Sequence, residues 1–404
     1  MKHAHKARLK PNTTQKSAFD FWFRRCNDVF NVGLEEKLEC YKKTGKYISF
    51  FDQKKELVDV KNWDASWKDV PNKSLTDMLK RLDTAFQKFF KKKSGFPNFK
   101  PLDQLHSIFF AKTDVSVEDG KLYLPKLKTP IAILDRREVK QGWTSVQLCR
   151  DNGLYSVSFL YDDKKEPEQP VLSDNFHELT GMDLGLMNMW VDSDGNVAQR
   201  FDVKLYNRYQ KRIAELQRSL STKTRGSRQY KRVKKQIGKA HSRLLNSRKD
   251  FIHKATTKYI DNVLSTPELV IGDIGVADMV NKDNKKSRKG LRVSFYNAAL
   301  GEAKRQLAYK GQKKGHTVTF VDEKFTSKAC SCCGHTKDDL KLSERTYTCN
   351  ECQTHILRDG NSAVNMKLVR LGQFHPWRWN SLGVKYFVLD KIAPTKYLNV
   401  ACAA

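Results

Sequence analysis

The chain has 404 residues and a formal net charge of +30. This length allows two or three domains, and a charge this positive usually means a polyanionic partner, most often nucleic acid. No run of about 18 apolar residues occurs, so we expect no membrane span, and the basic N-terminus lacks the apolar segment of a secretory signal. Four of the nine cysteines form two C-x2-C pairs and the other five do not belong to these pairs, which indicates an intracellular, reducing compartment rather than a disulfide framework.

The N-terminal part begins with a short basic strand that ends at Pro11. Asn12 followed by Gln15 is a helix-start pattern, and apolar residues then recur at helical spacing until Gly45. A second helical pattern starts at Ser74 and closes with the lysines at 91–93. These lysines are either a solvated helix end or a phosphate contact.

Short β-prone runs follow, separated by Gly, Pro and Asn-Gly turns. Together with the first strand they predict a small antiparallel β-barrel formed by residues 1–11 and 96–165, with the helical segment 12–95 inserted after its first strand. A linker rich in Lys, Glu and Pro is expected at 166–175. The predicted strands after the insertion cover residues 122–127, 131–134, 144–149 and 154–160.

The C-terminal half starts with a predicted strand, residues 178–190, that carries Asp183 in an apolar setting. An Asp in a strand is usually a satisfied structural carboxylate. Here Gly181 and Gly185 flank it, which leaves room for a ligand or a backbone to approach closely. Asp194 and Gly195 then form a hairpin-turn signal that leads to a second strand.

Residues 201–260 are unusually basic, with 18 Lys or Arg against three Asp or Glu, so their net charge of 18 − 3 = +15 is half the total. Apolar periodicity predicts a helical hairpin over 203–260, with its turn at Gly226 and Ser227. A charged helix face is often only solvated, but positive charges at this density favour contact with phosphates. We expect such contacts from Lys234, Lys235 and Lys239.

The remaining elements complete an alternating α/β pattern whose order matches an RNase H-like nuclease core, over residues 176–325 and 353–371. The predicted elements are a buried strand at 268–272, a basic loop at 281–290, a helix at 295–311, a strand at 316–321 and a helix at 358–371 with Asp359 in its first turn. The tail, 372–404, shows no clear pattern.

Cys330, Cys333, Cys349 and Cys352 form two C-x2-C pairs, a spacing typical of a zinc ribbon, here over residues 326–352. Four thiolates leave no open coordination position, so we predict a structural Zn²⁺ rather than a catalytic one. Cys332 lies inside the first pair and could compete as a ligand, but C-x2-C fits better than adjacent cysteines.

The sequence resembles the transposon-encoded TnpB proteins, relatives of Fanzor proteins and miniature type V CRISPR effectors. The matching stretches include LDTAFQKFFKKKSGFPNFK (82–100), GMDLGL (181–186), TSKACSCCG (326–334) and HILRDGNSAVNM (355–366). The resemblance implies a wedge-type N-terminal barrel with a helical recognition insertion and a RuvC-type nuclease core. It also implies a noncoding guide RNA, Mg²⁺-dependent cleavage of double-stranded target DNA, and protein readout of a short adjacent DNA motif.

We expect a monomer with one RNA. The chain would reside in a bacterial or virus-infected cytoplasm or nucleoid, or in a nucleus if it is eukaryotic.

By the same resemblance, Asp183 is the first catalytic carboxylate and Asp359 the last. The family's middle Glu falls on Gly272, and the neighbouring Asp273 should face the other side of its strand. Some relatives supply this carboxylate from the strand before the ribbon, which places Glu323 in that role. Three possibilities stay open: Glu323 as the third magnesium ligand, Asp273 in its place, or an inactive site.

We therefore consider three functions. The first is a guide-RNA-dependent DNA endonuclease. The second is a nuclease-inactive, RNA-guided DNA-binding repressor, which Gly272 motivates. The third is a zinc-ribbon RNA-binding protein without a DNA target, which the acidic positions disfavour.

Overall fold

A computed structural model divides the chain into two compact units, residues 1–166 and 167–404. It describes residues 2–101, 104–135, 137–151, 153–162, 172–273, 275, 294, 298–341 and 343–374. The boundary falls within the segment that the sequence predicts as a linker. No helix in these ranges is long and apolar enough to cross a membrane.

The first unit is built on a seven-stranded antiparallel sheet with the strand order β2-β6-β7-β1-β5-β4-β3. Its edge strands β2 and β3 are joined only by the short 3₁₀ helix η3 (Lys112–Asp114). A flat sheet of seven strands is about 29 Å wide, more than this connection can span, so the sheet must curl strongly. The strands are β1 (Lys2–Lys10), β2 (Ser107–Ala111), β3 (Ser116–Glu118), β4 (Lys121–Tyr123), β5 (Ile131–Leu134), β6 (Trp143–Asp151) and β7 (Leu154–Asp162).

The predicted strands of this unit are largely confirmed. The run 122–127 is shorter than predicted, because β4 ends at Tyr123 and Lys126 adopts a left-handed backbone (φ 67°) that ends extended structure. The strands β2 and β3 were not predicted from the sequence.

The helices of this unit pack on the sheet through one hydrophobic core, and they are α1 (Thr13–Thr44), α2 (Phe50–Trp63), η1 (Ala65–Asp69) and α3 (Asn72–Phe90). Helix α1 begins and ends as predicted: Asn12 and Gln15 form a capping box, and Gly45 closes the helix at φ 67°. The predicted start of the next helix at Ser74 is wrong. Ser74 lies inside α3, where its buried hydroxyl donates to the Phe109 carbonyl (2.5 Å). Helix α2 is not predicted from the sequence.

The second unit contains a five-stranded mixed sheet with the order β10-β9-β8-β11-β12. Strands β8 (Leu179–Asp183), β9 (Asn188–Asp192) and β10 (Val197–Gln199) form an antiparallel meander, while β11 (Glu268–Gly272) and β12 (Thr317–Val321) run parallel to β8. The 3₁₀ helix η4 (Phe176–Glu178) precedes β8. The single strand predicted for residues 178–190 is wrong: the chain turns back after Asp183, so this stretch supplies two strands.

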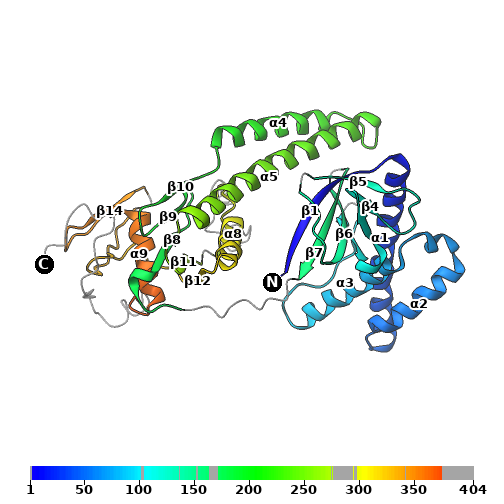
Figure 1. Cartoon of the computed structure of the whole chain (residues 1–404), viewed down its shortest axis with the longest axis horizontal. Helices are drawn as coiled ribbons and strands as arrows, with labels where there is room; N and C mark the ends of the chain where they lie inside the picture. Colours follow the sequence, from blue (N-terminus) through cyan, green and yellow to red (C-terminus); the bar gives the residue numbers. More distant parts are fainter. Residues whose placement is uncertain are drawn as a thin grey trace. The chain divides into compact units, whose positions relative to one another are not determined.

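Helices cover both faces of this sheet (Figure 1). On one face, α9 (Arg358–Arg370) packs with Leu179, Val270 and Val321 through Met366. On the other, α5 (Arg228–Asn262) and α8 (Leu300–Lys313) pack on Met182, Leu269, Ile271 and their neighbours. Side chains alternate along a strand, so every second residue of β8 and β11 faces α9.

The predicted helical hairpin is confirmed. Helix α4 (Val203–Ser221) lies beside α5, and the turn contains Gly226 and Ser227, the latter capping α5 by accepting from the Tyr230 N–H. Ile213 and Leu216 of α4 pack on Val233, Ile237 and Ala240 of α5. The basic side chains are thereby left to the outer surface.

Two short strands, β13 (Thr346–Thr348) and β14 (His355–Leu357), form a separate hairpin between β12 and α9. The predicted loop at 281–290, most of the predicted start of the following helix, and the tail beyond residue 374 lie outside the described residues.

Helix α9 approaches β8 unusually closely at Gly181. A Cβ atom there would lie 1.8 Å from the carbonyl oxygen of Ala363, a contact with rigid backbone that no rotamer change can relieve. The absence of a side chain at Gly181 therefore sets how near α9 can lie to the sheet.

Gly181→Ala should consequently destabilise the second unit, by about 3 kcal/mol or more if overpacking behaves as in other cores. Thermal melting followed by circular dichroism would measure this. Gly301→Ala is the matched control, because nothing lies within 4 Å of a Cβ added on that α8 residue. A melting temperature of Gly181→Ala equal to that of the control would contradict the close-packing account.

Candidate functional site

Three carboxylates lie near the carboxyl ends of the parallel strands β8, β11 and β12. Asp183 is the last residue of β8, Asp359 lies in the first turn of α9, and Glu323 follows β12 by two residues. A Cβ on Gly185 would lie 4.0 Å from Oδ2 of Asp359, so the turn after β8 faces the start of α9. The charges of Asp359 and Glu323 both raise the pKa of Asp183, so all three carboxylates are within electrostatic range.

The carboxylate of Glu323 occupies the space that a side chain at position 272 would fill. A Cβ added to Gly272 would lie 2.5 Å from Oε2 of Glu323 and 3.2 Å from its Cβ. The register explains this. Gly272 pairs with Val321 on β12, and Glu323, two residues further, returns to the same face. Gly272 of β11 has no side chain, and the side chain of Glu323, just beyond the end of β12, occupies the space instead.

Asp273 is turned toward solvent rather than into this group, although its charge also raises the pKa of Glu323. Its side chain is 60% exposed and forms an ion pair with Lys304 of α8, the helix on the opposite face of the sheet from α9. Its backbone N–H continues the β11–β12 pairing by donating to the Val321 carbonyl (2.7 Å). The strand alternation that the sequence suggested is therefore observed.

The surroundings of Asp183 and Glu323 oppose their negative charge. Burial raises the pKa of Asp183 well above its usual range, and the charges of Asp359 and Glu323 add to this, while a hydrogen bond from Ser362 acts the other way. Burial and the charge of Asp322 raise the pKa of Glu323 to about 7. Oε2 of Glu323 is buried and has no hydrogen-bond partner among the described residues. Asp359 differs, because its Oδ1 accepts from Arg358 (3.4 Å). A buried carboxylate oxygen without a partner, close to two further carboxylates, suits a bound cation.

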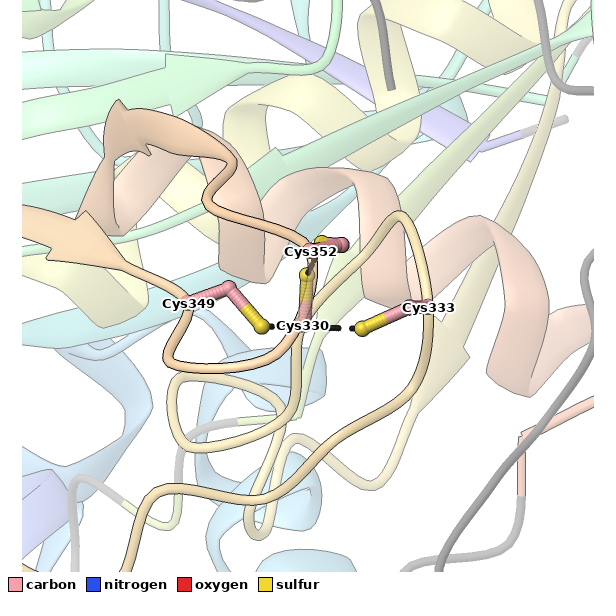
Figure 2. Close-up of side chains that lie close together, drawn as sticks. All are labelled: Cys330, Cys333, Cys349 and Cys352. Atoms are coloured by element: carbon pink, nitrogen blue, oxygen red, sulfur yellow. Dashed lines mark hydrogen bonds between the residues drawn. The ribbon is translucent and has the colours of Figure 1, made fainter. Parts of the chain in front are cut away.

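The four ribbon cysteines form the tightest ligand cluster. Their sulfur atoms all lie within 4.8 Å of one another, and Cys332 is not part of the group. Figure 2 shows the sulfurs converging from the two C-x2-C turns, with 3.6 Å between Cys330 and Cys352 and 3.5 Å between Cys333 and Cys349. This arrangement can hold one metal ion such as zinc. Within the described ranges no other group of three or more Cys, His, Asp or Glu is gathered as closely, the three carboxylates included.

The lysines chosen from the sequence, Lys234, Lys235 and Lys239, are exposed on α5 and do not join the carboxylates. Near the start of the same helix, a shallow cavity of about 580 Å³ is lined by Arg228, Gln229, Lys231, Arg232 and Lys235. The hairpin thus presents several cations on one short stretch.

Sequence reasoning missed two buried asparagines of α9, Asn361 and Asn365. Both bind the segment that leads into the ribbon. The available signal was Asn at i and i+4 inside a helix, where Asn is unfavourable unless its side chain has a specific partner.

Three family models match parts of the chain. One described as "Probable transposase" covers residues 163–283, one described as "Cas12f1-like, TNB domain" covers residues 301–366, and one described as "Helix-turn-helix domain" covers residues 1–46. In this chain the last stretch forms strand β1 and the single helix α1.

Two relatives align with this chain over almost its whole length and show the family to which it belongs. The chain is 30% identical over 376 residues to the Escherichia coli (strain K12) protein named "Putative RNA-guided DNA endonuclease InsQ", covering 90% of this chain and 91% of that protein. A Streptomyces pristinaespiralis protein named "Putative RNA-guided DNA endonuclease" is 28% identical, covering 91% and 89%. The chain therefore belongs to the TnpB family of IS605-type transposon proteins.

A solved structure, "Cryo-EM structure of the Cas12f1-sgRNA-target DNA complex", aligns over 88% of this chain and 83% of that one, with a TM-score of 0.54 and 14% identity. At this identity the similarity shows a shared fold.

The raised pKa of Glu323 predicts a pH-dependent stability in magnesium-free buffer. Between its ordinary value of 4.5 and about 7, the folded state binds more protons than the unfolded state. The free energy of unfolding should therefore fall as pH rises through this window. Glu323→Gln cannot lose a proton there, so its melting temperature should fall less between pH 5 and pH 7.5. Parallel melting curves for the two proteins would contradict this prediction.

Proposed function

We propose that this protein is a guide-RNA-dependent DNA endonuclease whose phosphodiester-hydrolysing site consists of Asp183, Glu323 and Asp359. The observation that carries the proposal is the position of the Glu323 carboxylate, in the space left open by Gly272. The whole-chain relatives named as RNA-guided DNA endonucleases support the substrate and the guide.

The fold supports this assignment. A three-stranded antiparallel meander extended by two parallel strands is the arrangement expected of an RNase H-like, RuvC-type core. Acidic residues at the carboxyl ends of β8 and β12 also fit such a core. We assign this core to residues 176–325 and 353–371, with the ribbon at 326–352 as an insertion. The curled sheet of the first unit would be the wedge-type β-barrel, and residues 12–95 its helical recognition insertion.

The three carboxylates fit magnesium, which prefers oxygen ligands and is commonly held by carboxylates next to a substrate phosphate. Bound Mg²⁺ would supply an activated water and stabilise negative charge on the leaving oxygen. The chain contributes three anionic groups from three different elements, so their spacing is set before substrate arrives. A nearby cation also favours ionised Asp183 and Glu323, whose protonation is otherwise promoted by burial.

The other partners follow from separate features. The four-cysteine cluster would hold a structural Zn²⁺ that maintains the ribbon. The basic α4–α5 hairpin would contact phosphates of the guide RNA or the target DNA. We further propose a monomer with one guide RNA, protein readout of a short motif beside the DNA target, and an intracellular location.

A nuclease-inactive, RNA-guided repressor is the second candidate, because β11 lacks the acidic residue expected at Gly272. The two functions differ in one respect: only the endonuclease requires all three carboxylates. Guided DNA binding without cleavage by the unmodified protein would favour the repressor.

Asp183→Ala, Glu323→Ala and Asp359→Ala should each abolish cleavage of a matched DNA target while leaving guided DNA binding unchanged, since each removes a charge that no neighbour replaces. The purified complex would be assayed for cleavage with Mg²⁺, and binding would be measured separately by gel shift.

Asp273→Ala is the matched control, one residue from the vacant position but on the opposite face, and it should keep most of its cleavage activity. Full activity in Glu323→Ala, or loss of activity in Asp273→Ala alone, would overturn the assignment of Glu323.

Replacing Lys234, Lys235 and Lys239 together with Ala should weaken nucleic-acid binding and reduce its salt dependence. The slope of log affinity against log salt should fall in magnitude by roughly 2–3, because each phosphate contact contributes about 0.7–0.9. Binding would be titrated between 50 and 300 mM salt. An unchanged slope would show that these lysines are only solvated.

A further inference from the structure

Four buried polar side chains connect the first zinc-binding turn to the carboxylate site. Asn361, Ser362 and Asn365 lie on α9, and Thr326 lies in the segment between β12 and Cys330; each is at most 1% exposed. We call these four residues the brace. Burying polar groups this completely is unfavourable unless each is hydrogen-bonded, so their partners are informative.

The two asparagines hold the backbone next to a zinc ligand. Asn361 donates to the Ala329 carbonyl (2.7 Å) and accepts from the Ser331 N–H (2.8 Å). These are the residues on either side of Cys330. Asn365 donates to the same Ala329 carbonyl (2.7 Å) and to the Thr326 carbonyl (2.8 Å). The start of the ribbon is therefore fixed to α9 and not only to its own metal.

The two hydroxyls continue this connection to the carboxylates. The Ser362 hydroxyl lies 2.7 Å from the Thr326 hydroxyl, and Ser362 also lowers the pKa of Asp183 against the effect of burial. The Thr326 hydroxyl is 2.8 Å from the Glu323 carbonyl, which in addition accepts from the Thr326 N–H (3.2 Å). Thr326 thus contacts both the backbone of Glu323 and Ser362 of α9.

The contacts of Thr326 hold the backbone of Glu323 in place. A carbonyl oxygen can only accept, so the Thr326 hydroxyl donates to the Glu323 carbonyl (2.8 Å). The Thr326 N–H donates to the same oxygen (3.2 Å). Both polar groups of Thr326 therefore fix the residue that supplies the third carboxylate.

We propose that the brace positions Glu323 beside Asp183, so that the zinc-bound turn and the Thr326 hydroxyl set the affinity of the carboxylate site for divalent cations. This inference rests on the proposed function only for the reaction that the cation supports. The affinity for the cation can be measured whether or not the protein cleaves DNA. The brace residues are positioning residues, since they act through Glu323.

Thr326→Val tests the proposal because it removes the hydroxyl at nearly constant volume, whereas Thr326→Ser retains it. In the full-length protein with its guide RNA, Thr326→Val should raise the Mg²⁺ concentration for half-maximal cleavage about tenfold, a usual effect of losing a partner of a metal ligand. Thr326→Ser should restore the original dependence. Zinc content and guided DNA binding should stay unchanged in both variants.

A second readout is independent of cleavage. The Mn²⁺-induced rise in melting temperature of the full-length protein without RNA should need about tenfold more Mn²⁺ in Thr326→Val. Thr256→Val is the matched control: this threonine is equally buried and its hydroxyl also donates to a carbonyl (Ile252, 2.8 Å), but on α5 at the opposite face of the sheet. It should leave the cation dependence unchanged.

The outcomes separate the two claims. An unmodified protein that does not cleave would refute the proposed function, while the Mn²⁺ measurement would still test the brace. Unchanged cation dependence in Thr326→Val, failure of Thr326→Ser to restore it, or loss of zinc and DNA binding in parallel with cleavage would overturn the brace.

Discussion

The contact between α9 and strand β8 at Gly181 is the constraint on which the second unit depends. A carbonyl oxygen of the helix lies where a side chain of the strand would begin. At this distance the first turn of α9 places Asp359 beside the end of β8, and Met366 lies over Gly272. At the other end of the helix, Arg370 donates two hydrogen bonds to the buried Glu268 of β11. These contacts hold the helix along its whole length. They therefore fix the position of its first turn, which carries Asp359.

The two glycines on this face of the sheet have different consequences. Gly181 permits a close approach of backbone, whereas Gly272 leaves a space that Glu323 fills with its carboxylate. Anionic oxygens collected in a partly buried site are unfavourable without a cation, which is the physical meaning of the raised pKa values of Asp183 and Glu323. The same polar segment that follows Glu323 leads directly into the four-cysteine ribbon, so the proposed magnesium and zinc sites share one short stretch of chain.

Much of this arrangement could be predicted from the sequence, because its signals are local. The capping box at Asn12, the C-x2-C spacings and the alternation that turns Asp273 away from Gly272 all depend on a few neighbouring residues. The errors came from non-local effects. Residues 178–190 look like one apolar strand, but the chain reverses after Asp183 because β9 must pair back on β8. Ser74 resembles a helix cap in the sequence, but its hydroxyl donates a hydrogen bond to the Phe109 carbonyl on strand β2. The brace joins residues about 35 positions apart, which no local pattern reveals.

The most direct test of the central claim is to locate the divalent cation. Crystals of the full-length protein grown with Mn²⁺ would show its position by anomalous scattering. The account predicts a cation coordinated by carboxylate oxygens of Asp183, Glu323 and Asp359, at about 2.0–2.2 Å if it occupies the site as magnesium would. A cation bound by Asp273, or one held without Glu323, would contradict it.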